Sequence, residues 1–260
     1  HENYFIPHSL PEPEQVTNVL EWLIEHCEDS GYKPIYVDPV EMAESLGFDE
    51  ERELGIHLHL LEEMGFILRS VDATLKASVR LLAPLEAPRI IGVGLNYVSH
   101  IRETKHATPA LPMLFMKHPS AVIGPGEPIV YPKHAQKVDY EGELAVVIGR
   151  HARRVSEAQA LEYVLGYTCA NDVSERVTQL AEMKMGCLLV GKSYDTFCPL
   201  GPAIATGLDP ANLDLTTRLN GQARQRINTS DLLFSAARLV SYLSQAMTLW
   251  PGDVILTGTP

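Results

Sequence analysis

The stretch VDYEGELAVVIG, residues 138–149, carries three acids at alternate positions and then an apolar run. Residues two apart in a β-strand point to the same face, so Asp139, Glu141 and Glu143 would line one face with about 7 Å between neighbours. The apolar residues that follow predict burial, and buried carboxylates require a counter-charge. A bound cation or a fully hydrated strand edge are the two interpretations that these residues allow.

Another acid stands at the end of a second strand-like run. In YTCANDVSER, residues 167–176, Asp172 follows apolar and β-branched residues. Three carboxylates from two strands could form an open site for Mg²⁺ or Mn²⁺, which prefer a few oxygen ligands together with water and substrate oxygens.

Composition sets the broad class of the protein. A chain of 260 residues with 45% hydrophobic residues can bury the core of one large domain or two small ones. No apolar run approaches the roughly 20 residues that span a bilayer, and no signal-peptide pattern is visible at the start. The four cysteines show neither CxxC pairs nor zinc spacing, which is typical of reduced thiols. These features predict a cytoplasmic globular protein without a membrane partner.

Charge separates the first third of the chain from the rest. Residues 1–80 contain 17 acidic and 5 basic residues, whereas residues 81–260 are balanced. Helical spacing over residues 14–29 is followed, over residues 39–70, by a helix–turn–helix–strand pattern that resembles a winged helix. Its second helix is acidic, so we predict a small acidic helical module and no nucleic-acid partner. A ligand-sensing DNA-binding protein remains the alternative from another functional class.

Strand patterns dominate from residue 84 onward. Two helices interrupt them: one after Ser156, where SEAQ forms a capping-box pattern, and one over residues 231–247 before a Pro251–Gly252 turn. Few, segregated helices predict an α+β fold with a large β core. The expected strands cover residues 90–95, 113–117, 127–132, 143–149, 165–172, 203–206, 216–221 and 253–258.

A histidine and a glutamate stand three apart in GLNYVSHIRET, residues 94–104. On a helical turn, His100 and Glu103 would share a face. A carboxylate beside an imidazole raises its basicity and orients it, as a general base requires. The pair could equally be a surface contact.

Two segments mimic nucleotide-binding loops. Residues 92–97, GVGLNY, lack the third glycine of a dinucleotide fingerprint. Residues 186–193, GCLLVGKS, match the P-loop pattern, but they follow a helical segment and precede two prolines. We therefore interpret Lys192 as a positive charge for an anionic substrate, or as a structural cation.

Taken together and in order, seven motifs resemble the fumarylacetoacetate hydrolase family. The resemblance covers residues 84–260 and implies a mixed β-roll of that family's C-terminal type, usually a homodimer. The expected domains are the acidic module, residues 1–80, and a catalytic roll, residues 84–260, that is incomplete at its C-terminal end. The motifs are IIGVGLNYVSHIRE, PMLFMKHPSAVIGPGEPIVYP, DYEGELAVVIG, GYTCANDVSERVTQ, GKSYDTFCPLGP, LNGQARQRINTSDLLF and PGDVILTGTP.

The resemblance also implies the site residues. It places Mg²⁺ or Mn²⁺ on Glu141, Glu143 and Asp172, with Asp139 behind these ligands. It assigns catalysis to a dyad of His100 and Glu103 together with Lys192. The residues implied to contact substrate are Tyr97, Arg176, Gln179 and Thr259. The chain departs from the family pattern at Val177 and Thr178, where Arg-Asp usually precedes the final hydrophobic-Gln pair.

The activity implied is metal-dependent C–C hydrolysis of acylpyruvates and related β-diketo acids in aromatic catabolism. In that reaction the partner is a small 2-oxo acid substrate: His100 would activate a water that attacks its distal carbonyl, and a pyruvate-type enolate would leave. Decarboxylation of oxaloacetate-type acids, or isomerisation of a hydroxymuconate-type diacid, are alternatives on the same site. A catalytically inactive scaffold also remains open.

Overall fold

The computed structural model describes residues 35–37, 46, 67–71, 77–86 and 88–260. The chain divides into two units, residues 1–82 and 83–260. In the first unit, β1 (Ile35–Val37), β2 (Ile67–Val71) and β3 (Ala77–Leu81) form an antiparallel sheet in the order β1-β3-β2. Strand β2 corresponds to the strand predicted before residue 70. The predicted helices lie outside the described residues, so the winged-helix module stays a prediction.

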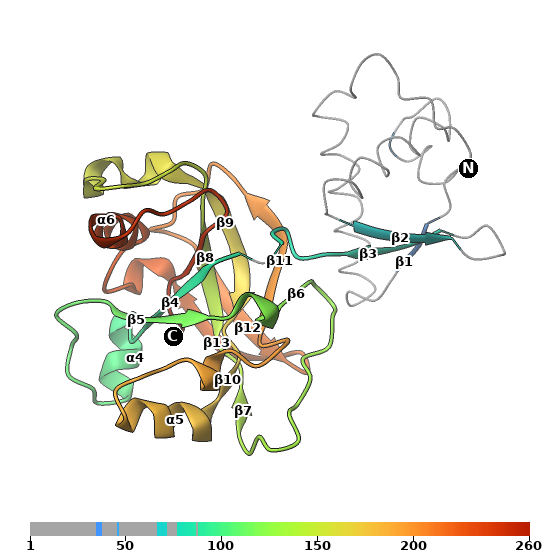
Figure 1. The fold of residues 1–260 in the computed structure, drawn as a ribbon, viewed down its shortest axis with the longest axis horizontal. Helices are drawn as coiled ribbons and strands as arrows, with labels where there is room; N and C mark the ends of the chain where they lie inside the picture. The colour runs from blue at the N-terminus through green and yellow to red at the C-terminus, as the bar shows by residue number, and fades with distance from the viewer. Residues whose placement is uncertain (1–34, 38–45, 47–66, 72–76, 87) are drawn as a thin grey trace, which may run out of the picture. The chain divides into compact units, whose positions relative to one another are not determined.

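The second unit is built on a curled seven-stranded mixed sheet (Figure 1). Strand β4 runs parallel to β14, β6 runs parallel to β11, and the other neighbours are antiparallel. The mixed sheet with few helices confirms the predicted α+β class. In spatial order the strands are β5 (Met113–Lys117), β4 (Ile90–Gly94), β14 (Val254–Leu256), β8 (Gly142–Ile148), β9 (Val164–Asn171), β11 (Cys198–Ala205) and β6 (Val122–Ile123).

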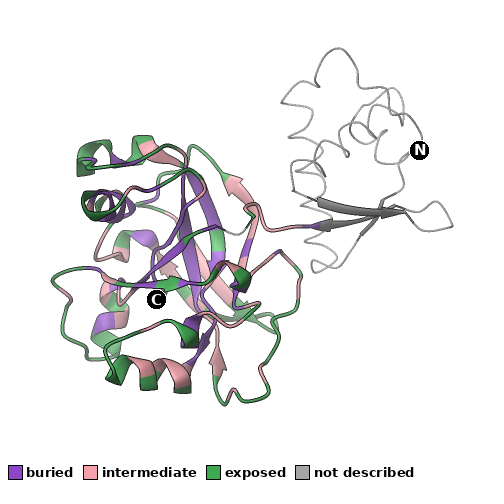
Figure 2. Ribbon diagram, in the orientation of Figure 1, coloured by how far each residue is buried: buried purple, intermediate pink, exposed green. Residues whose placement is uncertain are grey.

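Strand β8 is apolar on both faces because both faces are covered. Leu144, Val146 and Ile148 belong to one core cluster, which also contains residues of helix α6 (Ala236–Ala246). Ala145, between them, belongs to a second cluster on the opposite face. Figure 2 shows the central strands buried along their length. Burial on two faces explains why the strand reads as a continuous apolar run rather than an alternating one.

The helices described in residues 88–260 are short and lie outside the seven-stranded sheet. Two further α-helices of the described residues are α4 (Val98–Glu103), which follows β4 in the chain, and α5 (Arg176–Lys184), which lies between β9 and β11 in the chain (Figure 1). No helix in the described part of the chain is long and apolar enough to cross a membrane. The 3₁₀ helices are η1 (Pro119–Ala121), η2 (Glu157–Tyr163), η3 (Val190–Lys192) and η4 (Thr229–Asp231).

Helix α6 begins at a well-formed cap, whereas the capping box predicted at Ser156 is wrong. Ser235 accepts a hydrogen bond from the amide of Arg238 at 3.1 Å. The Ser156 hydroxyl instead donates to the side-chain oxygen of Gln159 at 2.8 Å and caps no amide. The segment that follows is the 3₁₀ helix η2, whose narrower geometry does not present the amides that a capping box needs.

Two strand predictions also require correction. Residues 127–132 form no strand, because Pro128 and Pro132 cannot donate ladder hydrogen bonds. A strand missed in the sequence, β13 (Gln222–Asn228), pairs with β12 (Asp214–Leu219). The residues that join them, Asn220 and Gly221, both have positive φ, which is the signature of the tightest hairpin turns.

The three alternating acids do not share one strand. Asp139 ends the short strand β7 (Val138–Asp139), which pairs with β10 (Ser174–Glu175), and Glu143 belongs to β8. Glu141 lies in the break between them. The predicted single carboxylate face is therefore wrong for Asp139, although Glu141 and Glu143 still turn toward a common point.

Candidate active site

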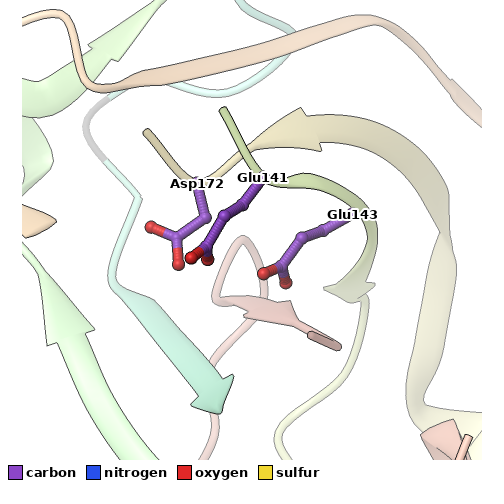
Figure 3. Close-up of side chains that lie close together, drawn as sticks. All are labelled: Glu141, Glu143 and Asp172. Atoms are coloured by element: carbon purple, nitrogen blue, oxygen red, sulfur yellow. The ribbon is translucent and has the colours of Figure 1, made fainter. Parts of the chain in front are cut away.

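Three buried carboxylates meet at the ends of two adjacent strands. Gly142 of β8 pairs with Asn171 of β9, and the amide of Asp172 donates to the carbonyl of Glu141 at 2.8 Å. One oxygen from each of Glu141, Glu143 and Asp172 lies within 4.8 Å of the others. Figure 3 shows the three carboxylates side by side. Strand pairing thus brings Asp172 to the two glutamates that the sequence placed close together.

Two buried lysines bind this carboxylate cluster. The ammonium of Lys192 lies 2.7 Å from Glu141 Oε2 and 2.5 Å from Asp172 Oδ2. Lys117 Nζ lies 2.6 Å from Asp172 Oδ1 and also donates to the carbonyls of Val173 and Lys192. Lys117 was not predicted as a site residue. Its signal in the sequence is a charge that ends the otherwise apolar strand MLFMK.

An arginine connects the cluster to Asp139. Arg176, the first residue of α5, pairs with Glu141 and, at 2.9 Å, with Asp139. Its Nη1 also donates to the side-chain oxygen of Gln179 at 3.0 Å. Asp139 therefore contacts the guanidinium of Arg176, and through it the carboxylate cluster.

The three carboxylates differ in their electrostatic environment. Burial, together with Asp172 and Glu141, raises the pKa of Glu143 well above its ordinary value. Burial acts in the same direction on Asp172, but Lys117 and Lys192 outweigh it and lower the pKa of Asp172. No lysine or arginine in the described residues forms an ion pair with Glu143. Three converging hard oxygen donors, one of them without a cation, fit a divalent metal ion such as Mg²⁺ or Mn²⁺.

A glycine near the chain's last residues holds Glu143. The amide of Gly258 donates to Glu143 Oε2 at 2.6 Å. Gly258 has φ +101°, and a Cβ there would lie 2.9 Å from the Asn96 Cβ and 3.0 Å from the Val93 carbonyl oxygen. Only glycine suits this backbone and this space. Asn96, which the sequence reasoning missed, fixes the same segment by donating to the carbonyl of Thr257 at 2.8 Å.

A pocket of about 260 Å³ opens beside the carboxylate cluster. Thr259, one of its walls, donates to the carbonyl of Gly142 at 3.1 Å and accepts from Gln225 at 2.7 Å. Gln225, on the unpredicted strand β13, is a further residue that the sequence reasoning missed. The predicted site residues that line the pocket are His100, Glu141, Glu143, Arg176, Gln179, Lys192 and Thr259.

His100 lines this pocket as an uncharged base. It lies on α4, and burial lowers its pKa below 6.5; Glu103 opposes this shift, whereas Arg176 and His106 add to it. The ring is therefore neutral at pH 7 and can accept a proton. Glu103 is exposed on the same helix, lies outside the pocket lining and forms no hydrogen bond with His100. The structure brings only the histidine of the predicted dyad into the pocket.

Tyr97 lies behind the site rather than in it. The residue is fully buried, and its hydroxyl has no hydrogen-bond partner within the described structure. Burial, with smaller effects of Glu143 and Asp231, raises its pKa. Tyr97 does not line the pocket, so its predicted contact with substrate stays a prediction.

The P-loop-like segment binds a carboxylate of the chain itself. Glu182 of α5 accepts hydrogen bonds from the amides of Leu189, Val190 and Gly191 at 3.2, 2.7 and 2.9 Å. In a phosphate-binding loop, amides of this kind cradle the ligand. Here they tie α5 to the segment that carries Lys192.

Comparison with known proteins identifies the family. The model of the fumarylacetoacetate (FAA) hydrolase C-terminal domain matches residues 89–260. An uncharacterized protein of Archaeoglobus fulgidus is 50% identical over 183 residues, which cover 70% of this chain and 72% of that protein. The mitochondrial oxaloacetate tautomerase FAHD2A of Bos taurus is 43% identical over 189 residues, which cover 71% of this chain and 60% of that protein.

A solved structure agrees with these matches. The crystal structure of 5-carboxymethyl-2-hydroxymuconate delta-isomerase from Mycobacterium smegmatis has 52% sequence identity and a TM-score of 0.64. The match covers 70% of this chain and 69% of that chain. Because the bovine relative is named as mitochondrial, the cytoplasmic location expected from the sequence stays a prediction. The carboxylate cluster, the fold and the family match lead to one conclusion: this chain is an enzyme of the fumarylacetoacetate hydrolase family.

Proposed function

We propose that the enzyme interconverts the keto and enol forms of a small 2-oxo acid of the oxaloacetate or hydroxymuconate type. The observation that carries this proposal is the placement of a neutral base, His100, and a buried ammonium, Lys192, on one pocket beside the carboxylate cluster. The names of the similar tautomerase and isomerase support it. They do not specifically support the acylpyruvate hydrolysis expected from the motifs.

The metal ligands in this proposal are Glu141, Glu143 and Asp172, with Mg²⁺ or Mn²⁺ as the ion. Once bound, the ion would act as a Lewis acid that favours negative charge on the 2-oxo oxygen. Lys192 adds a fixed positive charge. Burial opposes its ionisation, but attraction to Asp172 and Glu141 prevails and raises its pKa, so it stays protonated at neutral pH.

His100 moves the proton. Its neutral ring accepts the proton from C3 of the keto acid, and the C–H electron pair forms the C2=C3 double bond. The carbonyl electrons pass to the 2-oxo oxygen, which then takes up the proton from His100. The net change is the transfer of one proton from C3 to oxygen, and the reverse path restores the keto acid. Neither direction requires water, so the absence of a His100–Glu103 hydrogen bond is compatible with this chemistry.

Substrate positioning is assigned to residues of the pocket wall. Arg176, Gln179 and Thr259 offer hydrogen-bonding groups beside the carboxylate cluster. Tyr97 is buried and does not line the pocket, so it would affect substrate binding only indirectly. We also propose that the enzyme is a homodimer, and light scattering after gel filtration measures this directly.

Product analysis tests the proposal. Oxaloacetate in D₂O is incubated with enzyme and Mg²⁺, or with enzyme and EDTA, and followed by NMR. Relative to enzyme-free samples with the same additions, we expect metal-dependent exchange of the C3 protons with no loss of the carbon skeleton. Release of CO₂ and pyruvate as the main event would replace tautomerisation by decarboxylation. Cleavage of an acylpyruvate, together with inert C3 protons of oxaloacetate, would restore the hydrolase assignment.

A further inference from the structure

One cation of the pocket has no carboxylate of its own. Three lysine or arginine residues line the pocket: Lys137, Arg176 and Lys192. Arg176 pairs with Asp139 and Glu141, and Lys192 pairs with Glu141 and Asp172. The side chain of Lys137 forms no ion pair or hydrogen bond with any residue that the structure describes. Of the three, Lys137 is therefore the cation available to an anionic ligand.

The backbone of Lys137 is fixed next to the site. Its amide donates to Glu175 Oε1 at 2.9 Å, and its carbonyl accepts from the amide of Arg176 at 2.8 Å. Lys137 thus stands in register with the first residue of α5, whose guanidinium contacts Glu141. A rigid backbone below a flexible four-carbon stem lets the ammonium reach a ligand in the pocket.

The charged groups of the pocket differ in depth. Glu141, Glu143 and Lys192 are buried, whereas Lys137 is exposed. A ligand bound to the buried groups by its 2-oxo acid end would extend its other end toward the mouth of the pocket. A carboxylate at that end would meet the unpaired ammonium of Lys137, and a charge-assisted hydrogen bond is stronger than a neutral one.

We propose that Lys137 binds the distal carboxylate of the substrate and selects 2-oxo dicarboxylates over 2-oxo monocarboxylates. This inference rests on the proposed function for the orientation of the substrate, with the 2-oxo acid end toward the buried carboxylate cluster. Lys137 would determine which substrate binds, whereas His100 and Lys192 would carry out the chemical step.

The test compares two ligands that differ in one group. Dimethyloxaloacetate and trimethylpyruvate share a 2-oxo acid attached to a quaternary carbon, which carries a carboxylate in the first and a methyl group in the second. Neither has a C3 proton, so neither can be tautomerised. Dimethyloxaloacetate can still lose CO₂, so NMR of the sample after the titration must show that it is intact. Calorimetry with the Mg²⁺-loaded enzyme gives the two dissociation constants and their ratio.

Three variants isolate the charge of Lys137. Lys137→Met keeps most of the stem and removes the ammonium, and we expect it to weaken binding of dimethyloxaloacetate roughly tenfold. Binding of trimethylpyruvate should change less than about twofold. Lys137→Arg should restore most of the affinity for the dicarboxylate. Lys133→Met removes the same charge from a nearby exposed lysine that does not line the pocket, and it should leave both constants unchanged.

The outcomes separate this inference from the proposed function. Equal weakening of both ligands in Lys137→Met, or an equal effect of Lys133→Met, would overturn the role of Lys137. Failure of the wild-type enzyme to bind the dicarboxylate more tightly than the monocarboxylate would also overturn it. A selective loss in Lys137→Met supports it, whether or not oxaloacetate exchanges its C3 protons, since that exchange tests the proposed function alone.

Discussion

Lys117 Nζ lies 2.6 Å from Asp172 Oδ1, and both side chains are fully buried. The ammonium has two more acceptors, the carbonyls of Val173 and Lys192, so all three of its protons are used. A single side chain from β5 thus joins two segments that carry site residues. Its partner Asp172 lies 55 residues away in the sequence, which is why no local pattern pointed to it.

Loss of Lys117 should destabilise the protein. Lys117→Met leaves a buried carboxylate with one fewer cation and leaves two carbonyls without their donor, so we expect the free energy of unfolding to fall by about 3 kcal/mol. Arg238→Met is the matched control, because Arg238 forms an exposed pair with Glu157 and should contribute less than about 1 kcal/mol. Urea denaturation measures both. Equal losses in the two variants would contradict the structural role of Lys117.

His100 and Glu103 should differ in their effect on catalysis. We expect His100→Gln to lower kcat/KM by about 10²- to 10⁴-fold, as loss of a general base does. Glu103→Gln should change it less than about fivefold, because an exposed charge contributes at most about 1 kcal/mol. The two rates are measured by oxaloacetate tautomerisation. Equal damage from both substitutions would indicate a working dyad and favour hydrolysis.

The dependence of kcat/KM on pH should report the ionisation of His100. Burial lowers the pKa of His100 below 6.5, and only the neutral ring accepts a proton. The acidic limb of kcat/KM should therefore lie below pH 6.5 in the wild-type enzyme and disappear in His100→Gln. A limb that persists unchanged in the variant would assign it to another group.

Glu175 should stabilise the fold in a pH-dependent way. Burial opposes its ionisation, but the amides of Thr178, Lys137 and Gln136 donate to it and lower its pKa from 4.5 to about 2. A carboxylate with a lowered pKa in the folded state stabilises the fold above the unfolded pKa and loses that effect as pH falls through the folded one.

We therefore expect Glu175→Gln to cost about 1 kcal/mol or more at pH 6, as loss of a helix cap does. The difference from wild type should shrink between pH 4.5 and about 2. Unfolding measured across this range checks the trend, with Glu157→Gln as an exposed control. A difference that stays constant with pH would show that the charge of Glu175 is not the cause.

Two cysteines should differ in reactivity. Burial raises the pKa of Cys198 to about 12, so almost no thiolate exists at pH 8. Cys187 is exposed. Iodoacetamide at pH 8 should alkylate Cys187 in the folded protein and reach Cys198 only after denaturation, as peptide mass spectrometry would show. Equal labelling of both in the folded state would place Cys198 at the surface.

The sequence predicted those parts of the fold and site that local patterns encode. Apolar runs located β4, β5, β8 and β9, and the alternation of Glu141 and Glu143 indicated their common direction. Strand pairing was needed to bring Asp172 beside them. Residues such as Lys117 and Gln225 act through partners distant in the sequence, so no spacing rule finds them. The strand predicted over residues 127–132 was wrong because apolar residues alone do not provide ladder hydrogen bonds, and the prolines of this segment have no amide hydrogen to donate.

The most direct test of the central claim is metal-dependent exchange of the C3 protons of oxaloacetate in wild type and Glu143→Gln. Glutamine keeps the shape of the side chain and can still accept from Gly258, but it removes the charge that lacks a cation. We predict exchange that requires Mg²⁺ in wild type and in Glu157→Gln, and a loss of at least about tenfold in Glu143→Gln. All rates are taken above the exchange that oxaloacetate shows without enzyme under the same conditions. Enzyme-dependent exchange that continues in EDTA, or that is unchanged in Glu143→Gln, would contradict a metal-dependent isomerase.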